Sequence, residues 1–145
     1  MNRTGTPTPN PSIERTASPT CSCRSCQTLE RMTPHLVTLR DGTTANIHQS
    51  GSGLWACPIC GSVELQAAPY FGDGATSFEM CSCGFEFGFD DDPAASVEAN
   101  PSVQANWSRW RLRFLSRFRT HPVALAEVIA RLEAIGVKVE SKNAL

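Results

Sequence analysis

Two closely spaced cysteine pairs constrain the fold of this chain more than any other feature. Cys57 and Cys60 lie in CPICG, and Cys81 and Cys83 lie in CSCG. The glycine after the first pair permits the left-handed backbone that aims amide N–H groups at sulfur. Residues 61–80 are long enough for a hairpin that returns the chain to the first pair. Four thiolates about 2.3 Å from one ion form a closed tetrahedral site, so we predict one structural Zn²⁺ here.

The second pair leaves alternatives open, because C-x-C is one residue tighter than the usual C-x-x-C knuckle. Free thiols and redox chemistry are the main alternatives. A rubredoxin-type iron centre is disfavoured because it uses two C-x-x-C knuckles. A catalytic zinc is also disfavoured, since four cysteine ligands leave no position for water or substrate. A metal would stabilise a segment with few core residues, by about 10–16 kcal/mol in comparable sites.

Three further cysteines, Cys21, Cys23 and Cys26, form the cluster CSCRSC. Three thiols need a fourth ligand, which His35 or His48 could supply. The favoured alternative is that they are idle thiols in a mobile segment. A second zinc site is therefore a disfavoured hypothesis.

The sequence divides into three parts, which are residues 1–20, 21–53 and 54–145. The first is rich in Thr, Ser and Pro and predicts a disordered tail. The second holds the cysteine cluster and a short hairpin around the turn dipeptide Asp41-Gly42. Gly51-Ser52-Gly53 predicts a flexible joint, and we place the domain boundary there. The third part is the zinc-ribbon and helical domain.

Two amphipathic helices are predicted after the cysteines. Asn100-Pro101 is a helix-start signal for a helix over 101–119. Its apolar stripe consists of Val103, Trp107, Trp110, Phe114 and Phe118. A second helix begins at Thr120-His121-Pro122 and ends at Gly136 as a left-handed cap. Its apolar face consists of Leu125, Val128, Ile129, Leu132 and Ile135. VKVE, residues 137–140, predicts a short terminal strand. The expected fold class is α+β, a zinc-ribbon β-hairpin unit with two C-terminal helices.

Charge is distributed unevenly along the chain. No Lys or Arg lies between Arg40 and Arg109, whereas that stretch holds nine acidic residues: Asp41, Glu64, Asp73, Glu79, Glu86, Asp90, Asp91, Asp92 and Glu98. Four thiolates around zinc add a formal negative charge, so the ribbon would repel a phosphate backbone. The first helix instead concentrates five arginines: Arg109, Arg111, Arg113, Arg117 and Arg119.

This arginine helix has three interpretations. Aromatic side chains between arginines are typical of base stacking with phosphate contacts, and also of an amphipathic helix on a membrane surface. The favoured interpretation is structural: the aromatic stripe packs on the ribbon and some arginines pair with its acidic loop. Such pairs contribute about 0–1 kcal/mol each.

Other motifs give no catalytic signature. Asp90-Asp91-Asp92 lacks the spaced ligands of a calcium loop, so a solvated turn or N-cap region before Pro93 is favoured over Mg²⁺ or Ca²⁺. His121, at a helix start, is interpreted as a surface residue. No glycine-rich phosphate loop or nucleophile elbow occurs in the sequence. We therefore expect no enzymatic activity.

The compartment is inferred from the cysteines and from the apolar pattern. The chain has seven cysteines, an odd number, and its first twenty residues contain no apolar core of a signal peptide. No apolar run approaches the roughly 20 residues that span a bilayer. We expect a soluble cytoplasmic protein, where clustered cysteines bind metal more often than they pair.

The block as a whole resembles a known family. CPICG, the loop YFGDG and SFEMCSCGFEFGFDDD are similar to small bacterial cysteine-rich CPCC-type zinc-ribbon proteins, and WSRWRLRFL is similar to their tail. The resemblance covers roughly residues 54–145 and implies zinc binding by the two cysteine pairs. This chain departs from the family in its second pair, which commonly has one more residue between ligands. The resemblance also implies an immunity or accessory role in bacterial conflict systems.

Together these features predict a non-enzymatic structural-zinc protein that binds another protein, with the acidic ribbon facing a basic partner. The alternative is a nucleic-acid-binding zinc ribbon that uses the arginine helix 101–119. A third hypothesis is a redox or metal sensor that uses CSCRSC.

Overall fold

The protein has an α+β fold, as the sequence predicts. The structure is a computed structural model that describes residues 31–92 and 102–140. Its elements are β1 (Thr33–Thr38), β2 (Thr44–Gln49), β3 (Trp55–Ala56), β4 (Val63–Leu65), α1 (Val103–Ser116) and α2 (Pro122–Ala134). The strands form one antiparallel sheet in the order β1-β2-β3-β4. The predicted disordered tail and the CSCRSC cluster lie outside the described residues.

The hairpin predicted around Asp41-Gly42 is confirmed. β1 pairs with β2 from Thr33 opposite Gln49 to Thr38 opposite Thr44. Gly42 has a φ of +80°, which the turn requires and which glycine adopts at little cost. The Leu39 amide donates to the Thr43 carbonyl at 2.7 Å and closes the turn.

The glycine joint at residues 51–53 is an ordered turn within the sheet. The Ser50 amide donates to the Leu54 carbonyl at 2.8 Å, and the Gly53 amide donates to the Ser50 carbonyl at 3.0 Å. Gln49 then pairs with Trp55 across the turn. The strands on both sides of the predicted boundary therefore belong to one sheet.

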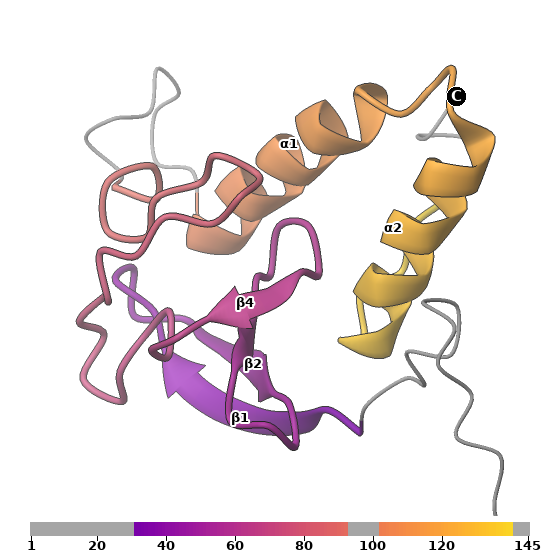
Figure 1. The fold of residues 1–145 in the computed structure, drawn as a ribbon. Helices are drawn as coiled ribbons and strands as arrows, with labels where there is room; N and C mark the ends of the chain where they lie inside the picture. Colours follow the sequence, from indigo (N-terminus) through magenta and orange to yellow (C-terminus); the bar gives the residue numbers. More distant parts are fainter. Residues whose placement is uncertain (1–30, 93–101, 141–145) are drawn as a thin grey trace, which may run out of the picture.

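The core consists of two apolar clusters. The first joins the hairpin, the four cysteines, the loop aromatics and the start of α1, and its members include Val37, Leu39, Ile47, Ile59, Tyr70, Phe85, Phe87 and Trp107. The second joins β3, the end of α1 and α2 through Ala56, Leu115, Val128, Leu132 and Ile135. Figure 1 shows α1 above the strands and α2 to their right, with the rose segment of residues 66–92 beside the first turns of α1.

Helix α1 begins later than predicted. Its N-cap is Ser102, whose hydroxyl accepts a hydrogen bond from the Ala105 amide at 3.1 Å, whereas Asn100 and Pro101 lie outside the described residues. The predicted stripe is largely confirmed, with Val103 and Trp107 buried and Trp110 and Phe114 packed against the first cluster. Phe118 lies beyond the helix, and the fully buried Leu115 was not predicted.

Helix α2 confirms the predicted start and stop, and the segment after it corrects the predicted strand. Pro122 opens the helix, and Gly136 has a φ of +77°. The Val137 amide donates to the Leu132 carbonyl at 2.9 Å, and the Gly136 amide donates to the Glu133 carbonyl, which together form a Schellman cap. Residues 137–140 form no strand, because this cap turns Val137 and Val139 onto the second cluster.

Candidate metal centre

The first cysteine pair lies in a tight turn between β3 and β4. The Cys57 amide donates to the Ser62 carbonyl, and the Gly61 amide donates to the Cys57 carbonyl, both at 2.8 Å. The Ile59 amide points at the Cys57 sulfur from 3.4 Å. Gly61 has a φ of +73°, and a Cβ there would lie 2.8 Å from the Arg131 backbone of α2. This turn therefore presents its thiols inward while its glycine packs against α2.

The second pair forms the same turn with one residue fewer. The Cys81 amide donates to the Phe85 carbonyl at 2.9 Å, and the Gly84 amide donates to the Cys81 carbonyl at 2.8 Å. Gly84 has a φ of +93° and follows the second cysteine, as Gly61 does in the first turn. The shorter C-x-C spacing thus keeps the closing hydrogen bonds of a metal-binding knuckle.

All four sulfur atoms converge on one point. Cys57, Cys60, Cys81 and Cys83 are buried free thiols, and their sulfurs lie within 4.8 Å of one another. The Cys57–Cys83 sulfur distance is 3.9 Å and the Cys60–Cys81 distance is 3.5 Å. Sulfurs at the corners of a zinc tetrahedron are ~3.8 Å apart when each Zn–S bond is ~2.3 Å. The donor set, the spacing and the burial therefore fit a tetrahedral thiolate-bound metal ion.

The electrostatics of the cluster favour a cation at its centre. Burial, together with the neighbouring thiols, raises the pKa of the Cys57 thiol. Hydrogen bonds from Cys57 lower the pKa of Cys60 and of Cys83. Four thiolates in a buried space repel one another unless a positive ion lies between them. The cluster can thus hold a soft or borderline divalent ion such as Zn²⁺.

Arg111 of α1 and Arg117, the C-cap residue of that helix, extend to the knuckles. The Arg111 guanidinium donates to the Pro58 carbonyl at 2.6 Å, and the Arg117 guanidinium lies 3.4 Å from the Cys83 carbonyl. Pro58 and Cys83 belong to different knuckles, so α1 spans the metal centre. These cations also offset the formal charge of four thiolates around a divalent ion.

Glu64 on β4 links the two knuckles. Its carboxylate accepts hydrogen bonds from Ser62 Oγ at 2.9 Å, from Ser82 Oγ at 3.0 Å and from the Ser82 amide. Burial raises the pKa of Glu64, but these hydrogen bonds and one from the Cys81 thiol outweigh it and lower the pKa to about 2. The sequence does not predict this role, because the spacing of Glu64 from the cysteines does not reveal it.

Asp91 contradicts the predicted solvated turn. The residue is 2% exposed, and its carboxylate accepts hydrogen bonds from the Gly88 amide at 2.7 Å and from the Tyr70 hydroxyl. Trp107 of α1 donates to the same hydroxyl at 3.1 Å, and Arg40 pairs with Asp91 at 4.0 Å. Burial and the Asp91 charge raise the pKa of Tyr70, which keeps its hydroxyl a donor. Asp91 lies buried because this network satisfies its charge.

The other predicted ligands are not in this centre. His35 packs its ring 4.9 Å from the Trp55 ring, and His48 lies on β2. Cys21, Cys23 and Cys26 lie outside the described residues, so the disfavoured hypothesis of a second site stays untested. Among residues 31–92 and 102–140, the four-cysteine group is the one cluster of potential metal ligands.

No family model, curated protein or solved structure matches the chain. The resemblance to CPCC-type proteins therefore stays a prediction. Within the residues that the structure describes, no helix is long and apolar enough to cross a membrane. The fold and the site together define the protein as a small α+β protein with a buried four-cysteine centre that could hold a metal ion.

Proposed function

We propose that the four cysteines hold a structural zinc ion and that the protein is a non-enzymatic module that binds another protein. The observation that carries the first part is the burial and convergence of all four thiols on one point. Four thiolate ligands saturate tetrahedral zinc, so the ion fixes the fold and leaves no position for substrate.

The binding surface in this proposal is formed by Phe78, Met80 and Phe89, which follow β4 and are not part of the β1–β2 hairpin. This surface is called the hairpin face. These side chains are 68%, 62% and 65% exposed. They lie on one hairpin, in which Met80 bridges to Glu86 and the Phe78 ring covers Gly88. Large apolar side chains gathered at the surface mark interaction sites in soluble proteins.

Backbone strain at Phe78 supports this surface. Phe78 has a φ of +56°, a left-handed conformation that a bulky residue adopts at a cost of about 1–3 kcal/mol. A glycine would fit the turn without that cost, and the exposed ring contributes little to the core. Strained, exposed aromatic residues of this kind occur at functional sites.

The charge around the hairpin face indicates a basic partner. Asp73, Glu79, Glu86, Asp90 and Asp92 lie on the same segment, which has no Lys or Arg of its own; Arg40 of the β1–β2 turn pairs with one of these five, Asp92. Acidic residues around an apolar centre favour a partner with the opposite charge. The resemblance to CPCC-type proteins extends this proposal to an immunity or accessory role in a bacterial conflict system.

The nucleic-acid alternative comes second. Two of the five helix arginines, Arg111 and Arg117, contact the knuckles, and Arg113 lies over the Trp110 ring at 5.4 Å. These contacts favour a structural role for the helix over phosphate binding. Steep salt dependence of RNA or DNA affinity, lost in Arg109→Ala/Arg113→Ala, would restore the alternative.

The test is affinity purification of the zinc-loaded chain from lysate of its native host, run in parallel with and without nuclease. The wild-type chain should retain a basic protein that Phe78→Ser/Phe89→Ser loses. Leu36→Ser/Val123→Ser is the matched control, since both residues are exposed apolar side chains elsewhere on the surface, and it should retain the partner. Recovery of nucleic acid without any protein would reject the proposal.

A further inference from the structure

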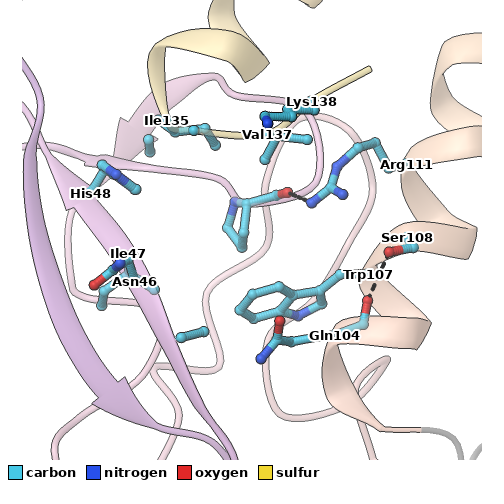
Figure 2. Close-up of a pocket in the computed structure, with 14 residues that line it drawn as sticks. Asn46, Ile47, His48, Gln104, Trp107, Ser108, Arg111, Ile135, Val137 and Lys138 are labelled. Atoms are coloured by element: carbon cyan, nitrogen blue, oxygen red, sulfur yellow. Dashed lines mark hydrogen bonds between the residues drawn. The ribbon is translucent and has the colours of Figure 1, made fainter. Parts of the chain in front are cut away.

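A cavity of about 540 Å³ lies between β2, α1 and the segment that follows α2. Figure 2 shows Arg111, Trp107 and Gln104 of α1 on one side and Asn46, Ile47 and His48 of β2 on the other. Val137 and Lys138 border it along a third side. A cavity of this size accommodates a small molecule. Its lining residues include neither the four cysteines nor the residues of the hairpin face.

The charged residues that line the cavity are cations. Arg111 and Lys138 line it, and no Asp or Glu is among its lining residues. Burial lowers the pKa of Arg111, although the Cys57 thiolate acts in the opposite direction. Within the described residues Arg111 forms no ion pair with a carboxylate; it donates to the Pro58 carbonyl, and its Nε is buried without a partner. A half-buried guanidinium beside an open cavity favours an anion there.

The remaining walls favour a ligand with an apolar body and a polar end. The Trp107 ring, Ile47 and Val137 are apolar, whereas Asn46 and Gln104 carry amide groups. Burial, with a smaller contribution from His35, lowers the pKa of His48, so its ring is neutral at pH 7 and can donate or accept a hydrogen bond.

We propose that this cavity binds a small organic anion, with its carboxylate or phosphate between Arg111 and Lys138 and its apolar body against Trp107. Arg111 also touches the first knuckle through Pro58, so the bound anion lies next to the metal centre. The proposal is independent of the protein-binding function, because it uses none of the residues of the hairpin face.

The test compares three probes on the full-length zinc-loaded chain. Benzoate carries a carboxylate, phenyl phosphate carries a phosphate, and benzyl alcohol has the same ring without charge. We expect benzoate, phenyl phosphate or both to shift the Trp107 indole N–H resonance saturably, with the tighter binder identifying the anion class. Benzyl alcohol should bind at least about tenfold more weakly, since it lacks the charge-assisted hydrogen bonds.

Variants locate the site. Lys138→Gln changes an exposed side chain and should weaken binding about threefold to fivefold, the effect of one partly exposed charge. Arg111→Lys should weaken it about tenfold, because lysine lacks the guanidinium fork. Arg113→Gln, an exposed change on the same helix outside the cavity, should leave affinity unchanged. The proposal is overturned if neither anion gives a saturable shift, if benzyl alcohol binds as tightly, or if Arg113→Gln weakens binding as much as Lys138→Gln.

Discussion

At the scale of single residues, Asp91 connects parts of the chain that are far apart in sequence. Its buried carboxylate binds Tyr70, Gly88 and Arg40, and Tyr70 in turn binds Trp107 of α1. Removal of one partner from such a network leaves other buried polar groups unsatisfied, which costs more than the bond itself.

Asp91→Ala should therefore lower the free energy of unfolding by about 3–5 kcal/mol, measured by urea unfolding of the zinc-loaded protein. Asp92→Ala is the matched control, since that side chain is 39% exposed and pairs with Arg40 at 3.8 Å. The control should cost about 1 kcal/mol or less. Equal losses in the two variants would contradict the structural role given to Asp91.

The two glycines that follow the cysteine knuckles should differ in the stability lost on substitution by alanine. Gly61 and Gly84 both have left-handed backbones, but a Cβ at Gly61 would meet the Arg131 backbone at 2.8 Å and one at Gly84 would meet nothing within 4 Å. Gly84→Ala should cost about 1 kcal/mol, the backbone penalty alone.

Gly61→Ala should cost about 2–4 kcal/mol, since it adds a clash with α2 to the same backbone penalty. Urea unfolding of both variants with zinc bound measures the difference. If Gly84→Ala is the more destabilising of the two, the result contradicts the close packing of the first knuckle against α2.

At the scale of elements, the hairpin turn caps the first helix. The Asp41 carboxylate accepts hydrogen bonds from the Thr43 amide at 2.9 Å and from the Val103 amide, the first residue of α1, at 2.8 Å. A carboxylate at a helix N-terminus also interacts favourably with the helix dipole. This one side chain therefore fixes the orientation of α1 relative to the β1–β2 hairpin.

Asp41→Ala should cost about 1–2 kcal/mol in urea unfolding. Burial raises the pKa of Asp41, but hydrogen bonds from Thr43 and Val103 outweigh it and lower the folded pKa. A lowered pKa gives stability that is fully present above the unfolded value of about 3.9 and is lost as pH falls through the folded pKa. The cost of the substitution should thus be the same at pH 8 and at pH 5.

Asp73→Ala is the control for Asp41→Ala, because Asp73 makes a similar turn contact with the Ala75 amide at 3.0 Å. It should cost clearly less, since its hydrogen bond lies within its own turn and does not reach a helix. A cost for Asp41→Ala that disappears between pH 8 and pH 5 would contradict the capping role.

The helices and turns that the sequence predicts correctly are those determined by residues close together in the chain. The apolar periodicity of α2, its Pro122 start and its Gly136 stop are all set within one segment. The Asp41-Gly42 turn is local too. VKVE failed as a strand because strand formation needs a partner edge, and the Schellman cap directs Val137 onto the core instead.

The part of the site that could be predicted is the part that the spacing of the cysteines determines. Two cysteine pairs with following glycines predict four converging thiols, and the structure brings them together. Glu64, Arg111 and Asp91 could not be predicted, because their partners lie far away in the sequence and are set by the packing of α1 and β4. The sequence places Asp91 in a solvated turn, because the burial of a charge is recognisable only from its partners.

At the scale of the whole molecule, the four cysteines belong to the cluster that joins the hairpin, the loop aromatics and α1. That loop segment, residues 66–92, has no regular strand or helix in the structure. This segment therefore lacks the regular hydrogen bonds of a strand or helix. Coordination of one metal ion by both knuckles would fix the segment at two points instead. We therefore expect a bound ion to hold this cluster together.

Urea unfolding of the chain with and without its metal tests whether an ion holds the cluster together. Under reducing conditions at neutral pH, elemental analysis should find a bound divalent ion, and a chelator should remove it. We predict a cooperative transition for the loaded chain, followed by tryptophan fluorescence, and none for the stripped chain until zinc is restored. Cys83→Ser should behave like the stripped chain. A stripped chain that unfolds cooperatively at the same urea concentration as the loaded one would contradict the account.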